Sequence, residues 1–330
     1  MRKPKVYITS RSFGLYSEGT LEFIKSVAEI VRSPYDRAMN EEELFQAAED
    51  VDALVIGGDK INRRIIEHAK KLKIIARHGV GVDNIDLKAA TEKGVVVVYT
   101  PYANAESVAD FTMGLLLSAA RRIPQACLSM KQGKWEATKF MGNEVYGKTI
   151  GIIGLGEIGY RVAKRAKGFD MKILYWSRRR KVDLEKELDA QYVSLETLLK
   201  TADFVTLHLA LTDETRGMIG EKEFNLMKKT AYFINTARGP IVNEEALYKV
   251  LSEKKIAGAA LDVYSKEPPS ADFPLFKLDN VLMFPHIAAY TVETISRMDR
   301  MNAEDLVKFF KGEKPQYVAN TEVLAKIKLK

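Results

Sequence analysis

The sequence predicts an α/β protein that contains two doubly wound parallel sheets. Short apolar runs alternate with amphipathic stretches from one end of the chain to the other, which is the pattern of successive βαβ units. The alternation restarts after a long apolar helix that begins near residue 105, and a length of 330 residues suits about two domains. We therefore expect two sheets, each with helices packed on it.

The first part of the chain contains short apolar runs that are typical of buried strands: Val6–Ile8, Ala53–Ile56, Ile74–Ala76 and Val95–Val98. Amphipathic segments between these runs predict helices over Glu41–Ala48 and Arg63–Lys71.

The second part begins with the largely apolar helix Ala105–Ala120 and a polar, glycine-containing stretch, Lys131–Gly147. Six strand candidates follow, which would complete one doubly wound sheet: Thr149–Ile153, Lys172–Trp176, Phe204–His208, Ala231–Asn235, Ala259–Val263 and Val281–Phe284. The last amphipathic helix, Val292–Lys311, could return to the first domain. The predicted domains are therefore 1–100 with 290–330, and 101–289.

The composition limits the kind of protein. Hydrophobic residues make up 46% of the chain, and no apolar window reaches the roughly 18 residues of a membrane span. The net charge of +7 is explained better by a solvated basic surface than by nucleic-acid binding. A single cysteine, Cys127, indicates a reducing, cytoplasmic setting. No His/Cys cluster has metal-ligand spacing, so no metal is expected.

A glycine loop lies between the strand Thr149–Ile153 and a helical stretch. Gly154 would permit a tight turn, Gly156 would let the backbone approach a pyrophosphate, and Gly159 would let helix and strand pack closely. Glycines that serve only a structural turn are the alternative. The strand before the loop and the helix after it favour dinucleotide binding, with the phosphates at the helix N-terminus.

The end of the following strand lacks the acid that usually holds the adenosine ribose. Ser177, Arg178 and Arg179 stand there, and the next acid is Asp183. A carboxylate would repel a 2′-phosphate, whereas a serine and arginines would bind one. The sequence therefore predicts NADP as the preferred cofactor with NAD possible; a solvated basic turn is the alternative.

Three charged residues follow strands of the second block: Arg238, Glu267 and His286. Because ligands bind at the carboxyl ends of strands in doubly wound sheets, we expect the three to converge. Histidine suits proton transfer near neutral pH, a carboxylate can orient its ring, and arginine can grip a carboxylate bidentately. The remaining histidines, His68, His78 and His208, are expected to be structural or solvated.

The chain resembles the D-isomer-specific 2-hydroxyacid dehydrogenase family over nearly its whole length. Besides the glycine loop, the matching stretches are 78–86 (HGVGVDNID), 107–110 (SVAD), 235–239 (NTARG), 261–263 (LDV) with Glu267-Pro268, and 285–287 (PHI). The resemblance implies a Rossmann dinucleotide-binding domain and a flavodoxin-like substrate domain. It also implies a homodimer with Ala105–Ala120 in the interface.

The resemblance implies a role for each group of residues. Arg238, Glu267 and His286 would be the catalytic set, while Val80 and Gly81 would offer backbone N–H groups to the substrate carboxylate. The full substrate-binding set is expected to be Val80, Gly81, Arg77 and Asn104.

The cofactor would be held at both of its ends. Asp262 and the carbonyl of Thr236 would hold the nicotinamide carboxamide. The full cofactor-binding set is expected to be Gly154, Leu155, Gly156, Glu157, Ile158, Gly159, Ser177, Arg178, Arg179, Thr112, Thr236, Ala237, Asp262 and Ala288.

The chain resembles two branches of the family, which act on different substrates. The stretches 123–126 and 133–136 look like phosphoglycerate dehydrogenases, but Gly57 and Gly58 stand where those enzymes place a phosphate-reading arginine. The stretch 175–178 (YWSR) instead looks like NADP-using glyoxylate and hydroxypyruvate reductases. We therefore favour a small unphosphorylated 2-oxo acid, with D-3-phosphoglycerate as the alternative.

A third possibility belongs to another class. Some relatives are co-repressors that bind a dinucleotide and act through protein contacts. The complete set of Arg238, Glu267 and His286 favours an enzyme, because a sensor needs no such set.

Overall fold

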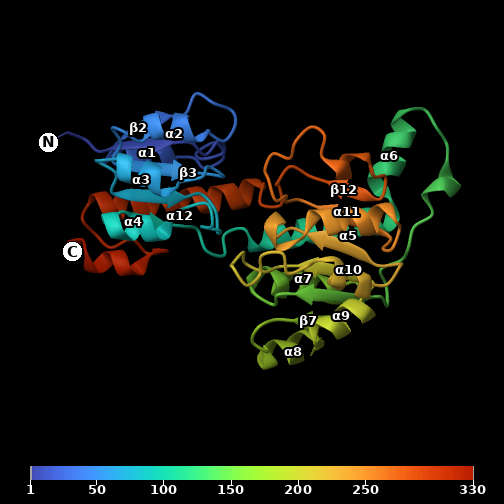
Figure 1. Ribbon diagram of the computed structural model, residues 1–330. Coiled ribbons are helices and arrows are strands. Elements are labelled where there is room, and N and C mark those ends of the chain that lie inside the picture. The colour runs from blue at the N-terminus through green and yellow to red at the C-terminus, as the bar shows by residue number, and fades with distance from the viewer. Residues whose placement is uncertain (1, 330) are drawn as a thin grey trace. The chain divides into compact units, whose positions relative to one another are not determined.

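The computed structural model of the protein describes residues 2–329 (Figure 1). The chain divides into two compact units. Unit 1 takes in the chain up to Asn104 and again from Tyr290, and unit 2 runs from Ala105 to Ala289. No helix within residues 2–329 is long and apolar enough to cross a membrane.

Unit 1 contains a parallel five-stranded sheet. Its strands are β1 (Lys5–Ile8), β2 (Glu29–Arg32), β3 (Ala53–Ile56), β4 (Ile74–Arg77) and β5 (Val96–Val98), in the order β2-β1-β3-β4-β5. This is the strand order of flavodoxin-like sheets. The helices are α1 (Thr20–Lys25), α2 (Glu41–Ala47), α3 (Arg63–His68), α4 (Leu87–Lys93), α12 (Val292–Phe310) and the 3-10 helix η4 (Thr321–Ala325).

Helices cover both faces of this sheet because its strands are apolar on both sides. Along β3, Leu54 packs with α2, α3 and α4, and Val55 packs with α1 and α12. All four residues of β3 are buried, as expected for a central parallel strand.

Unit 2 contains a seven-stranded parallel sheet (Figure 1). The strands are β6 (Thr149–Ile153), β7 (Lys172–Trp176), β8 (Ala190–Tyr192), β9 (Phe204–Leu207), β10 (Tyr232–Asn235), β11 (Gly258–Leu261) and β12 (Val281–Met283). The strand order is β12-β11-β10-β9-β6-β7-β8. From β6 the chain adds β7 and β8 on one side and then β9 to β12 on the other, so the order of successive strands switches sides between β6 and β9. Such a switch leaves a crevice at the carboxyl ends of the strands, where dinucleotides bind in Rossmann domains.

Two cores lie on opposite faces of the unit 2 sheet. One is formed with α5 (Ala105–Arg121), α7 (Glu157–Lys167) and α8 (Val182–Leu188), and the other with α9 (Leu195–Thr201), α10 (Glu221–Leu226) and α11 (Glu244–Ser252). The remaining elements are α6 (Ile123–Lys131), η1 (Ala137–Phe140), η2 (Gly239–Ile241) and η3 (Pro274–Lys277). The predicted α/β class with two doubly wound sheets is confirmed.

The structure corrects the expected strands. β2 and β8, both edge strands, were not predicted, so the sheets have five and seven strands rather than four and six. β8 has one buried residue in three and β2 has none, so neither forms an apolar run. The helix expected over 63–71 ends at His68, and the helix expected over 292–311 ends at Phe310.

Candidate functional site

The glycine loop joins β6 to α7 at the point where the sheet order reverses. Gly154 has a φ of 101°, and a Cβ there would lie 2.6 Å from the carbonyl oxygen of His208. A Cβ on Gly159 would lie 2.1 Å from the carbonyl oxygen of Gly154, whereas a Cβ on Gly156 would meet nothing within 4 Å. Gly154 and Gly159 therefore permit close packing, and Gly156 faces open space that a ligand can enter.

The N-terminus of α7 is suited to bind phosphate. Gly156 is its N-cap and supplies no side chain, so the first N–H groups of the helix are available to an anion. Within the loop, Leu155 is buried and Glu157 forms an ion pair with Arg161 at 2.6 Å. Leu155 and Glu157 can therefore contribute to phosphate binding only through their backbones, as can Ile158 beside them.

The basic turn after β7 has a defined internal structure. Ser177 is buried and its hydroxyl donates to the carbonyl of Arg179 at 2.6 Å, so its proton is already engaged. Arg178 and Arg179 are exposed, and within residues 2–329 neither forms an ion pair. The structure therefore differs from the expectation that the Ser177 hydroxyl donates to a phosphate, and it leaves the two arginines available.

Glu267 and His286 form the centre of the candidate active site. One carboxylate oxygen of Glu267 lies 2.7 Å from Nδ1 of His286, and the other accepts the backbone N–H of Tyr264 at 3.0 Å. Burial alone would raise the pKa of Glu267, but the bond to His286 and the nearby Arg238 charge lower it overall. Glu267 is thus an ionised residue that fixes the His286 ring through Nδ1.

His286 stands on a strained loop that Asp262 holds in place. Its φ of 55° lies in the left-handed region, which costs about 1–2 kcal/mol for a residue with a side chain. Asp262, at the end of β11, is fully buried and accepts the N–H groups of Ile287 and Ala288 at 2.9 and 2.8 Å. Burial raises the pKa of Asp262. Asp262 and the backbone of Ala288 therefore hold the loop that carries His286, a role that the sequence analysis did not predict.

Arg238 is placed by two residues that the sequence analysis did not single out as site residues. Asn235, at the end of β10, accepts the N–H of Ala237 at 2.9 Å and donates to the carbonyl of Arg238 at 3.2 Å. A Cβ on Gly239 would lie 1.9 Å from the carbonyl carbon of Tyr264, so only glycine lets these two loops meet. The structure thereby brings Arg238, Glu267 and His286 together within unit 2.

Two of the expected cofactor-binding residues, Thr112 of α5 and Thr236 after β10, contact each other. The hydroxyls of Thr112 and Thr236 are 2.9 Å apart, and Thr112 also donates to the carbonyl of Val108 at 2.7 Å. Because the proton of Thr112 is used in this way, Thr236 donates to Thr112. This bond ties α5 to the turn that follows β10.

The expected substrate-binding residues belong to unit 1. Arg77 ends β4, and its guanidinium donates to the carbonyls of Gly81 and His78 at 2.9 and 2.6 Å. The Asn84 amide donates to the carbonyls of Gly57 and Asp59 at 3.2 and 2.7 Å. These bonds shape the loop that carries Val80 and Gly81. Asn104 is the last residue of unit 1 before α5.

The other histidines have structural surroundings. His78 is buried between Ser10 and Asp299, at 2.8 and 2.9 Å, and His68 stacks on the Phe45 ring. Burial lowers the pKa of His208 to about 3, so that residue is neutral at physiological pH. Within residues 2–329 no group of three or more His, Cys, Asp or Glu side chains could hold a metal ion.

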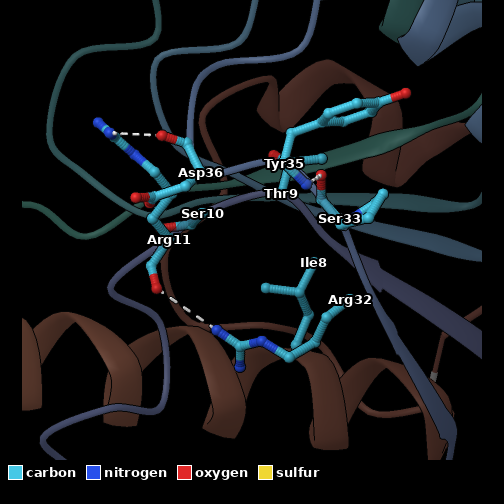
Figure 2. Close-up of a pocket in the computed structure, with 9 residues that line it drawn as sticks. Ile8, Thr9, Ser10, Arg11, Arg32, Ser33, Tyr35 and Asp36 are labelled. Atoms are coloured by element: carbon cyan, nitrogen blue, oxygen red, sulfur yellow. Dashed lines mark hydrogen bonds between the residues drawn. The ribbon is translucent and has the colours of Figure 1, made fainter.

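Unit 1 also contains a polar cavity of about 240 Å³, at the carboxyl ends of β1 and β2 (Figure 2). Arg32 donates to the carbonyls of Phe13 and Arg11 at 3.0 and 3.4 Å, and Arg11 donates to the carbonyl of Asp36 at 3.3 Å. These donors hold the surrounding loops together. The expected catalytic residues belong to unit 2 and do not line the cavity, so we place the active site elsewhere.

A Rossmann sheet with a glycine loop and an adjacent Arg/Glu/His set define a dinucleotide-dependent dehydrogenase. The chain belongs to the D-isomer specific 2-hydroxyacid dehydrogenase family, whose NAD-binding domain matches residues 113–288. It is therefore an oxidoreductase with a nicotinamide dinucleotide as its cofactor, and the predictions of family and enzyme class are confirmed.

The named relatives include both glyoxylate reductases and D-3-phosphoglycerate dehydrogenases. The chain is 44% identical to a glyoxylate reductase of Korarchaeum cryptofilum, over 98% of this chain and 97% of that protein. It is 46% identical to a D-3-phosphoglycerate dehydrogenase of Methanocaldococcus jannaschii, over 93% of this chain but only 59% of that protein.

Solved structures share the fold. A Thermus thermophilus protein gives a TM-score of 0.86 at 34% identity, with 96% of this chain and 99% of that one covered. A glyoxylate reductase from Paecilomyes thermophila gives 0.84 at 30% identity, with 97% and 99% covered.

Proposed function

We propose that the protein reduces a small, unphosphorylated 2-oxo acid, glyoxylate or hydroxypyruvate, to the D-2-hydroxy acid, with NADPH as the preferred cofactor. The Glu267–His286 pair beside Arg238 carries the proposal that the site performs this chemistry. The choice of acid rests on Gly57 and Gly58, which follow β3, and on Arg77 at the end of β4.

The dinucleotide supplies the hydride when it is bound, and the residues of this chain handle the acid and the proton. His286 donates a proton to the developing alkoxide from Nε2, since its Nδ1 is held by Glu267. The planar guanidinium of Arg238 grips the substrate carboxylate and polarises the neighbouring carbonyl. Asp262 keeps the His286 loop in position through its two backbone bonds.

The surroundings of Gly57 and Gly58 support an unphosphorylated substrate. Neither residue can contact a phosphate through a side chain, and the next residue, Asp59, is buried and accepts from Thr9 at 2.5 Å. The Arg77 guanidinium is engaged by carbonyls of its own loop. Gly57, Gly58, Asp59 and Arg77 therefore offer a phosphate no unengaged cation, and Lys60, whose side chain is exposed, is left as the candidate for such a contact.

We therefore expect glyoxylate or hydroxypyruvate to be reduced with a higher kcat/KM than that for oxidation of 3-phosphoglycerate. Steady-state kinetics with a panel of 2-oxo acids and both reduced cofactors would measure this. Saturable oxidation of 3-phosphoglycerate that is efficient in the parent and lost in Arg77→Ala would contradict the choice of acid.

Exposed arginines at the 2′ position support the preference for NADPH. One charge-assisted hydrogen bond contributes about 1.5–3 kcal/mol, and exposure to water and salt moves the value toward the lower end. The parent should therefore bind NADPH roughly tenfold more tightly than NADH.

Replacing both arginines, as Arg178→Ala/Arg179→Ala, should bring the two dissociation constants close together. Lys172→Ala is the matched control, since Lys172 is an exposed cation at the opposite end of β7. A parent that binds the two cofactors equally would show that the turn does not select between them.

We also propose that the chain forms a homodimer through the region around α5 and α6. Apolar side chains are exposed on α6 and the segment after it: Ile123, Leu128, Met130, Trp135 and Met141. A cluster of this kind is typical of a protein–protein interface. Sedimentation equilibrium should give the mass of two chains, and a monomer at micromolar concentration would disprove the proposal.

A further inference from the structure

The basic turn after β7 is fastened to α8 by a group of three side chains, which we call the clasp: Tyr175, Arg180 and Glu185. Arg180 donates through Nε and Nη2 to the two carboxylate oxygens of Glu185, at 2.7 and 2.8 Å. The Tyr175 hydroxyl donates to Glu185 at 2.6 Å and accepts the backbone N–H of Lys181 at 2.8 Å. Both ends of the turn are thus bound to one carboxylate.

Two of the three clasp residues are less accessible than the turn they hold, whereas the side chain of Arg180 is 58% exposed. Tyr175 is fully buried, and the side chain of Glu185 is 15% exposed. The guanidinium of Arg180 also lies 5.8 Å from the centre of the Tyr192 ring. The hydrogen bonds from Arg180 and Tyr175 lower the pKa of Glu185 to about 2, so the carboxylate is ionised at neutral pH.

The three arginines of the turn therefore have different roles. The charge of Arg180 is paired with that of Glu185, which accepts from its Nε and Nη2. Arg178 and Arg179 are exposed, and the charge of Arg178 contributes to lowering the pKa of Glu214. Of its three arginines, the turn offers a 2′-phosphate the two that form no ion pair within residues 2–329, Arg178 and Arg179.

We propose that Tyr175 and Glu185 are positioning residues for cofactor selection, which hold the turn so that Arg178 and Arg179 face the 2′-phosphate of NADPH. The inference rests on the cofactor preference proposed above. Arg180 serves the clasp and does not contact the phosphate. Loops fixed before binding lose less conformational entropy when the ligand arrives, so the clasp raises affinity without touching the cofactor.

The variant that isolates the clasp is Tyr175→Phe, because it removes two hydrogen bonds and leaves every charge in the turn unchanged. Tyr160→Phe is the matched control, since the Tyr160 hydroxyl makes a similar 2.5 Å bond to Glu187 of α8 but does not contact the turn. A second variant, Arg180→Lys, keeps the charge and loses the two-pronged contact with Glu185.

Dissociation constants for NADPH and NADH would be measured on the parent and the three variants, with thermal unfolding to verify folding. Tyr175→Phe and Arg180→Lys should weaken NADPH binding about three- to tenfold, the size of one hydrogen bond. NADH binding should not change, and Tyr160→Phe should match the parent. This result would support the clasp.

Three other results would overturn it, and they are distinguishable. Unchanged NADPH binding in Tyr175→Phe would show that the clasp positions nothing. Equal weakening of NADPH and NADH binding would show that Tyr175 serves only the fold. A parent protein that binds NADPH and NADH equally would contradict the proposed cofactor preference, and the clasp would then have no preference to support.

Discussion

His286→Ala should lower turnover by roughly 10²–10⁴-fold, the contribution of a positioned general acid. His286 is the only member of the candidate set that can deliver a proton near neutral pH, and its ring is fixed by the 2.7 Å contact with Glu267. The measurement is kcat with glyoxylate or hydroxypyruvate at saturating cofactor. Cofactor affinity should stay close to that of the parent, since the glycine loop and the basic turn are unaltered.

The control for this experiment is His68→Ala. His68 stacks on Phe45 in unit 1, so its loss should affect stability at most. If His286→Ala keeps near-normal turnover, the proton donor is another group and the assignment of the active site fails. Loss of cofactor binding together with turnover would instead indicate damage to the fold.

Most of the fold could be predicted because the interior strands carry the signal. A central parallel strand such as β3 is buried on both faces, and its apolar run is visible in the sequence. The edge strands β2 and β8 carry no such signal, because one side of each lacks a neighbouring strand and their residues are half-exposed. Their positions follow from sheet topology, which no local pattern encodes.

The convergence of the candidate residues could also be predicted, because each one follows a strand. Glu267 and His286 come after β11 and β12, which are neighbours in the sheet, so their convergence follows from the order of the strands. The supporting contacts could not be predicted in the same way. For example, a side chain at position 239 would collide with the backbone of Tyr264, and this follows only from how two loops meet.

The basic turn after β7 shows the same limit most clearly. The sequence places a serine and three arginines after β7, and the sequence analysis assigned Arg178 and Arg179 to the cofactor without showing what Arg180 binds. The structure separates them through Glu185, five residues farther along the chain from Arg180. It also shows that the Ser177 hydroxyl is used within the turn. Assigning ligand contacts from sequence therefore fails where side chains already form hydrogen bonds or ion pairs with neighbouring residues.

Arg238→Lys should lower kcat/KM for the 2-oxo acid by roughly 10–100-fold although the positive charge is kept. The guanidinium can donate two parallel hydrogen bonds to a carboxylate, and loss of one such charge-assisted bond costs about 1.5–3 kcal/mol. Cofactor dissociation constants should remain near those of the parent, because the two bonds of Asn235 still fix the backbone of the Arg238 turn when the bond from the Arg238 side chain to the carbonyl of Ala237 is altered. Arg165→Lys is the matched control, since Arg165 of α7 binds two carboxylates of α5, those of Glu106 and Asp110. It should leave kcat/KM unchanged. An Arg238→Lys enzyme with parental kcat/KM would show that a point charge is sufficient and that Arg238 does not grip the substrate as a fork.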